Sequence, residues 1–181
     1  MKTRTRLILK LLYILSWIIF VGLCIEAGGF ITNAIFALVN PAVVKNLWHE
    51  VDLSGLLNFD TGHFFAETFI MCIVAVLRAC LFYLIIKILH NKKLDMARPF
   101  NTDLQRFINR ASFLSLLIGL FSWYGVHYAQ WLLTQGVKMP DAEYLRLGGA
   151  DVWLFMSVIL FVIAQIFSKG IDIQTENELT V

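Results

Sequence analysis

Four long apolar segments occupy most of this 181-residue chain and leave only short polar connections between them. They cover residues 7–39, 64–89, 113–133 and 152–169. A helix needs roughly 20 apolar residues to cross a hydrocarbon core, and lipid offers backbone groups no partner outside their own helix. The sequence therefore predicts an all-α integral membrane protein, a four-helix bundle built as a single domain over residues 1–181.

Composition favours a membrane protein over a soluble helical one. Hydrophobic residues make up 59% of the chain and charged residues only 15%, whereas about a quarter of the residues in soluble domains are charged. The polar segments are too short for an appended catalytic domain, and the chain carries no internal repeat. The lipid bilayer is therefore the first expected partner.

The basic residues predict the orientation, because positive charge in short loops resists translocation. Lys45, Lys138 and Arg146 are the only basic residues in the first and third loops. Most of the others flank the opposite ends of the spans: Lys2, Arg4, Arg6, Lys10, Lys87, Lys92, Lys93, Arg98, Arg106, Arg110 and Lys169. Both termini are thus expected in the cytoplasm, with the spans in the cytoplasmic membrane. This topology accounts for the basic residues, so direct nucleic-acid binding is not expected.

The first span is long enough to require an explanation. About 33 residues would reach roughly 50 Å as a helix, so the segment must tilt, protrude or break, and Gly28 with Gly29 is the natural place for a break. The basic start followed by an apolar run also resembles a signal peptide. A retained signal anchor is the better interpretation, because the apolar run continues past Glu26 to Val39.

A short amphipathic helix is expected in the first outer loop. Asn40 and Pro41 are typical of a helix start. One face of the next turns carries apolar side chains, which are Val43, Val44, Leu47, Trp48 and Val51. Such a helix either packs on the bundle as a lid or forms a gate or docking surface.

Polar residues also mark the approach to the third span. Pro99 and Phe100 end one structure, and Thr102 with Gln105 has the spacing of a capping box, so the third helix is expected to begin in the cytoplasm. Its polar face can contact lipid headgroups or a cytoplasmic protein. That face consists of Asp103, Arg106, Asn109 and Arg110.

Ionisable residues inside spans are costly and point to function. Helical rise places Glu26, Glu67 and His127 at a similar depth near the outer face, with His63 one turn from Glu67. Together they predict a hydrated cation, metal or proton site. The alternative is that they reach water, and that His127 bonds to a backbone carbonyl.

Other polar residues have weaker implications. Arg78 is expected to reach the inner headgroups or pair with Gln165, too deep for a direct ion pair with Glu26. His49, Glu50 and Asp52 form a second chelating candidate in the outer loop. The chain has no Walker loop, Gly-x-Ser-x-Gly elbow or His-Glu-x-x-His sequence, so neither an enzyme nor a cofactor is expected.

The C-terminal string Gly-Ile-Asp-Ile-Gln-Thr-Glu-Asn-Glu-Leu-Thr-Val, residues 170–181, is the most distinctive in the chain. Together with Pro99 and Phe100, it resembles the bacterial four-span membrane proteins called domain of unknown function 2975. Glu178 stands where aspartate is common in that family, and the first outer loop matches no family motif. The resemblance carries no known biochemical activity.

Members of that family often accompany small helix-turn-helix regulators, so the resemblance implies a membrane partner or sensor for a cytoplasmic DNA-binding protein. The acidic tail would dock a basic regulator surface, through Asp172, Gln174, Glu176, Asn177, Glu178, Leu179 and Val181. Its alternative is a solvated chain end. The competing function is a small cation or proton carrier, or a channel subunit, using the carboxylate and histidine site. A homo-oligomer is compatible with either function.

Overall fold

The computed structural model describes residues 2–40, 44, 51–90 and 100–179, with side chains described from Leu7 to Glu176. Every regular element in these segments is a helix, which confirms the all-α prediction. There are four long helices and one short one: α1 (Lys2–Val39), α2 (Ser54–Phe59), α3 (Thr61–His90), α4 (Thr102–Thr134) and α5 (Ala150–Leu179).

Three segments within these helices are long and apolar enough to cross a membrane: Leu7–Val39, Thr61–His90 and Ala150–Glu176. The protein is therefore a membrane protein with long apolar helices. The predicted third span, residues 113–133, lies within α4 and is fully helical. Several serines and glycines on α4 make it more polar than its neighbours.

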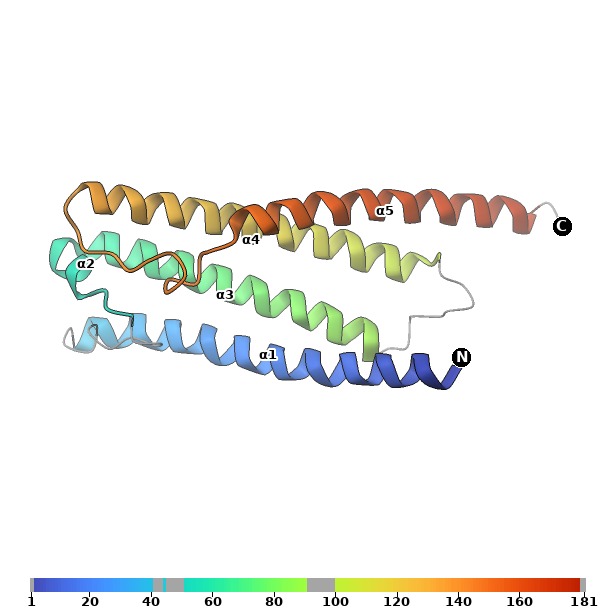
Figure 1. Cartoon of the computed structure of the whole chain (residues 1–181), viewed down its shortest axis with the longest axis horizontal. Coiled ribbons are helices and arrows are strands. Elements are labelled where there is room, and N and C mark those ends of the chain that lie inside the picture. Colours follow the sequence, from blue (N-terminus) through green and yellow to red (C-terminus); the bar gives the residue numbers. More distant parts are fainter. Residues whose placement is uncertain (1, 41–43, 45–50, 91–99, 180–181) are drawn as a thin grey trace.

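The four long helices lie side by side in a row rather than closing into a bundle (Figure 1). Within the described residues, α1 packs on α3, α3 packs on α4, and α4 packs on α5, whereas α1 makes no close backbone contact with α4 or α5. The expected closed four-helix bundle is therefore not confirmed. The two outer helices of the row keep most of their apolar surface exposed, as expected where lipid covers it.

Small residues on α4 explain why the helix packs closely on both sides. Ser112, Ser115, Gly119, Ser122 and Gly125 are all buried and recur every three or four residues. Small side chains let neighbouring helices approach closely, which substitutes for the hydrophobic effect where the surroundings are lipid. A stripe that makes α4 less apolar thus also holds it between α3 and α5.

The first helix does not break at Gly28 and Gly29, although a break was one of the three expected ways, with tilting and protrusion, to accommodate its length. α1 is continuous from Lys2 to Val39. The hydroxyl of Thr32 donates to the carbonyls of Gly28 and Gly29, at 2.9 Å and 3.0 Å. An apolar environment offers these peptide groups no alternative partner, so intrahelical bonds persist through the glycine pair. The helix instead ends at Val39, just before Asn40 and Pro41.

The start of α4 and the end of α5 also differ from the sequence interpretation. Asn101, not Thr102, is the N-cap of α4, and its side chain accepts a bond of 2.7 Å from the backbone N–H of Leu104. At the other end of the chain, the helix of α5 continues through the acidic tail as far as Leu179. The described part of the tail, up to Leu179, therefore continues the last helix.

α5 begins about halfway along the row and extends past the other helices at the end where α1 also starts (Figure 1). Residues 135–149 lead from the end of α4 back to the start of α5 and lie over α3 in the view of Figure 1. This segment, α2 and the adjoining ends of α3 and α4 form what we call the cap. Its core contains fully buried side chains, which are Leu53, Leu56, Phe64, Leu132, Leu145 and Leu147.

α2 was not expected from the sequence. Most of the expected amphipathic helix, including Pro41, Val43, Leu47 and Trp48, lies outside the described residues, as do His49 and Glu50 of the second chelating candidate. Val44 and Val51, which are described, are both buried. Asp52 lies just before α2, and its carboxylate accepts a bond of 2.8 Å from the backbone N–H of Ser54.

Candidate polar sites within the helix row

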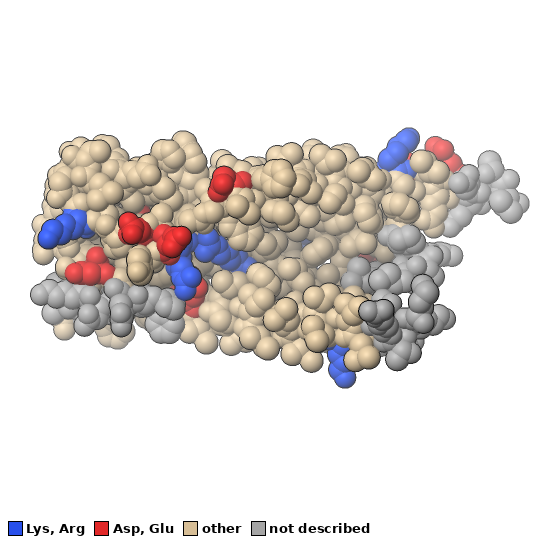
Figure 2. All heavy atoms as spheres, viewed as in Figure 1, with Lys and Arg blue, Asp and Glu red and all other residues tan. Residues whose placement is uncertain are grey.

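Glu26 forms an ion pair that the sequence analysis missed. Its Oε1 lies 3.7 Å from Nε of Arg146, a distance suited to an ion pair but too long for a hydrogen bond. The Glu26 side chain is only 14% exposed, whereas that of Arg146 is 46% exposed. Figure 2 shows acidic and basic side chains gathered on one face of the molecule, in the half that contains α2 and the segment 135–149. The pair fastens the segment 135–149 to α1.

The turn around Arg146 holds that residue in an unusual backbone conformation. Its φ of +58° lies in the left-handed region, which is uncommon for residues other than glycine. The N–H of Arg146 donates to the carbonyl of Glu143, and the N–H of Leu147 donates to that of Ala142. These bonds and the burial of Leu145 and Leu147 fix the turn, so Arg146 is presented to Glu26 by the backbone.

Arg78 completes a polar layer with this pair. Its guanidinium carbon lies 5.8 Å from the ring centre of Trp153 near the start of α5, and it is within electrostatic range of Glu26 and Arg146. Its Nε is buried without a hydrogen-bond partner. The expected pairing with Gln165 does not form, because Gln165 lies about 18 Å along α5 from Trp153 and is exposed. Arg78 points toward the Glu26 layer rather than to the inner headgroups.

Glu67 is the most isolated polar group of the described part of the chain. Its side chain projects from α3 and is fully buried, and neither carboxylate oxygen has a hydrogen-bond partner. A buried carboxylate without a partner is costly. It persists in a fold only where a proton neutralises its charge or a bound cation pairs with it. Such a position is suited to binding a proton or a cation.

His63 lies one turn before Glu67, at the N-terminal end of α3. Its Nδ1 makes a hydrogen bond with the hydroxyl of Tyr128 on α4, and its ring packs against those of Tyr128 and Trp131. Tyr128 is also within electrostatic range of Glu67. The half-buried His63 and Tyr128 therefore lie between the surface of the cap and the buried carboxylate.

His127 has a local partner. Its Nδ1 bonds to the backbone carbonyl of Trp123 at 2.9 Å, which is the alternative that the sequence left open, and the exposed imidazole packs on the indole of Trp123. Among the described residues, no three His, Cys, Asp or Glu side chains come together as a metal site. The four residues of the predicted site therefore do not share one site. Glu26 pairs with Arg146, Glu67 is buried one turn from His63, and His127 is exposed.

Sequence reasoning missed Arg146, Tyr128 and Trp153, although the first two left a signal in the sequence. Arg146 is one of only three basic residues in the predicted outer loops, so a loop cation facing a span carboxylate was available from the charge pattern. Tyr124, Tyr128 and Trp131 recur at helical spacing and mark an aromatic face of α4. Trp153 gave no comparable signal, because its contact with Arg78 depends on where α5 begins.

The described part of the tail includes Asp172, Gln174 and Glu176. Asp172 and Glu176 are exposed, and Gln174 is half-buried. Gln174 and Glu176 already have interaction partners. The backbone at Asn177, Glu178 and Leu179 is helical, whereas Val181 lies outside the described residues.

Comparisons of the chain with protein-family models, with curated proteins and with solved structures give no match. The fold and the polar sites above are therefore the basis for any functional proposal. The resemblance of the tail and of the Pro99-Phe100 motif to domain of unknown function 2975 stays a prediction.

Proposed function

We propose that this chain is a four-span protein of the bacterial inner membrane that holds a small helix-turn-helix regulator on its cytoplasmic tail. The observation that carries the proposal is the projection of α5 past the other helices, at the end of the row where α1 also begins (Figure 1). A tail presented as a rigid helix loses less conformational entropy on binding than a flexible one. The family resemblance of this tail supports the kind of partner.

Two arguments support four spans with both ends in the cytoplasm. α4 packs along α3 on one side and along α5 on the other, so it lies between two apolar helices that qualify as spans. Four antiparallel crossings return the chain to its starting side. The excess of Lys and Arg at this end of the row supports a cytoplasmic location for that side.

The chemistry of the tail favours a basic partner surface. Asp172 is exposed and makes no ion pair or hydrogen bond within the described residues, and Ile173 beside it is 49% exposed. Glu176 lies one turn beyond Asp172 on the same helical face. An acidic face next to an exposed aliphatic side chain complements a basic protein surface with a small apolar contact.

Deletion of residues 172–181 is expected to abolish capture of the regulator. The test is affinity purification of the full-length and truncated proteins from the native host in detergent, followed by mass spectrometry. A small DNA-binding protein recovered only with the intact tail is the expected result. Reversal of Asp172 to lysine should weaken capture, whereas reversal of Asp141 in the segment 135–149 should not. The same protein recovered with both lengths of chain would contradict the proposal.

A second candidate function is a proton or cation site at Glu67, favoured by the complete burial of an unpartnered carboxylate. Tyr128 and His63 provide groups able to pass a proton between this carboxyl group and the cap surface. This function would make the protein a small carrier or channel subunit. It depends on α3 and α4, and not on the tail.

Replacement of Glu67 by glutamine is expected to remove any proton movement through the protein, because an amide of similar shape cannot exchange a proton. The measurement is the internal pH of vesicles containing the reconstituted protein, followed with a dye after a potassium diffusion potential is imposed. Glu143→Gln, at an exposed position of the same cap, is the matched control. Equal proton fluxes for the wild type and Glu67→Gln would eliminate Glu67 as the site.

A further inference from the structure

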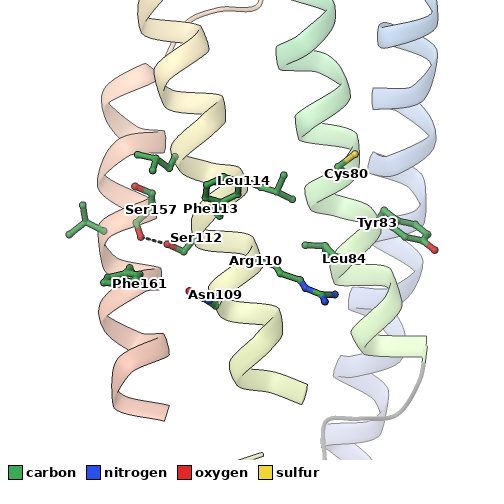
Figure 3. Close-up of a pocket in the computed structure, with 12 residues that line it drawn as sticks. Cys80, Tyr83, Leu84, Asn109, Arg110, Ser112, Phe113, Leu114, Ser157 and Phe161 are labelled. Carbon is green, nitrogen blue, oxygen red and sulfur yellow. Dashed lines mark hydrogen bonds between the residues drawn. The ribbon is translucent and has the colours of Figure 1, made fainter. Parts of the chain in front are cut away.

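A groove crosses the face of α4 between α3 and α5, in the half of the row nearer the chain ends. Its volume is about 830 Å³, within the range of roughly 300–1,000 Å³ typical of small-molecule sites. Figure 3 shows Leu84 and Tyr83 on α3, Phe113 on α4 and Phe161 on α5. The groove exists because the helices form a row, in which α3 and α5 stay apart on either side of α4.

The body of the groove offers an apolar surface only. Phe113, Val158 and Phe161 are each more than half exposed there. The two serines of the lining are already satisfied within the protein. The hydroxyl of Ser112 donates to the carbonyl of Ser157 at 2.8 Å, and the hydroxyl of Ser157 donates to the carbonyl of Leu154 at 2.7 Å. A hydrocarbon chain is the complementary occupant of this surface.

One end of the groove is positively charged. Asn109 and Arg110 lie on the turn of α4 that precedes Phe113, and the guanidinium of Arg110 extends toward Leu84 of α3 (Figure 3). Arg110 is exposed and forms no ion pair or hydrogen bond within the described residues.

Among the described residues, no acidic side chain lines the groove, and Asp103, two turns before Arg110 on α4, already has a partner. The charge at this end is therefore available to an anion. The polar end and the apolar body together match an amphiphile with one anionic headgroup.

We propose that this groove binds an anionic phospholipid of the cytoplasmic leaflet, with its phosphate at Arg110 and an acyl chain along Phe113, Val158 and Phe161. The inference rests on the membrane orientation proposed above, and not on the tail or on Glu67. Arg110 lies just before the apolar segment 113–133, which is the depth of the headgroups. A helix from a second copy would cover the apolar body but leave Arg110 without a counter-charge.

The test is lipid binding to the full-length protein after delipidation in detergent. Phosphatidylglycerol or phosphatidylcholine is titrated in, and bound lipid is counted by native mass spectrometry. Phosphatidylglycerol is expected to bind about fivefold more tightly, the gain that one basic side chain provides at an anionic surface. Arg110→Gln should remove this preference, whereas Lys10→Gln, which removes an exposed cation of α1, should keep it. Equal binding of the two lipids to the wild type, or an unchanged preference in Arg110→Gln, would overturn the proposal.

A second variant tests the apolar body of the groove independently of charge. Val158→Trp fills the groove and should weaken binding of both lipids, whereas Val152→Trp adds the same side chain to another exposed face of α5 and should not. The circular dichroism of both variants establishes that they fold alike. Lipid binding that is unaffected by Val158→Trp would place the lipid elsewhere and overturn the assignment to this groove.

Discussion

Replacing Gly119 by leucine is expected to force α4 away from α5 and to lower the free energy of unfolding by about 3 kcal/mol or more. A Cβ at this position would lie 2.8 Å from two side-chain carbons of Leu154 and 3.0 Å from its backbone nitrogen. The side-chain atoms can rotate away, but the backbone nitrogen belongs to the helix and cannot. The extra volume must therefore separate the two helices. Unfolding in mixed micelles of increasing dodecyl sulfate content, followed by circular dichroism, measures the loss.

Gly22 supplies the matched control for this substitution. It lies on the exposed surface of α1, and an added Cβ there meets no atom within 4 Å. Gly22→Leu should leave stability unchanged or raise it by up to about 1 kcal/mol, since glycine is a poor helix former. Similar losses at Gly22 and Gly119 would show that the effect is not helix packing.

Helix existence was predictable from the sequence because it depends on local properties. Runs of apolar residues in lipid can satisfy their backbone only as helices, so the segments 64–89 and 113–133 lie inside α3 and α4. The same principle was overlooked at Gly28 and Gly29. Glycine breaks helices where water can bond the released peptide groups, and that alternative is absent in an apolar environment.

The arrangement of the helices could not be predicted from residue spacing. Depth counted along each helix placed Glu26, Glu67 and His127 in one layer, but it gave no rotation about the helix axes and no order of neighbours. In the row, Glu26 contacts the segment 135–149, while His127 is exposed and bonds to its own helix. Three residues at a common depth converge only if their helices surround a common axis, and a row of helices has no such axis.

The starting point of α5 decided the environment of Arg78. The expected pairing of Arg78 with Gln165 assumes that the last span begins level with the outer ends of the other spans. α5 instead begins about halfway along the row, after residues 135–149 have led back from the end of α4 (Figure 1). Trp153 therefore reaches Arg78, and Gln165 lies farther toward the chain ends. An offset of this kind depends on the packing of the cap and leaves no periodic signal.

The polar layer of Glu26, Arg78 and Arg146 yields the second prediction of large effect. Glu26→Gln is expected to lower the free energy of unfolding by about 2 kcal/mol, less than the 3–5 kcal/mol typical of fully buried pairs, because Arg146 is partly exposed and water screens it. The loss arises because two arginines then face one another without a carboxylate. The measurement is again unfolding in mixed micelles.

A double-mutant cycle with Arg78→Met distinguishes repulsion between the two arginines from simple loss of the Glu26–Arg146 ion pair. Arg78 carries a buried Nε without a hydrogen-bond partner, so methionine at this position should leave stability nearly unchanged. In the Arg78→Met background, Glu26→Gln should cost only about 1 kcal/mol, because one of the two uncompensated cations is gone. Glu143→Gln, on the exposed turn before Arg146, should cost nothing in either background. An equal cost of Glu26→Gln with and without Arg78 would mean that the carboxylate serves Arg146 alone and that Arg78 is held by Trp153.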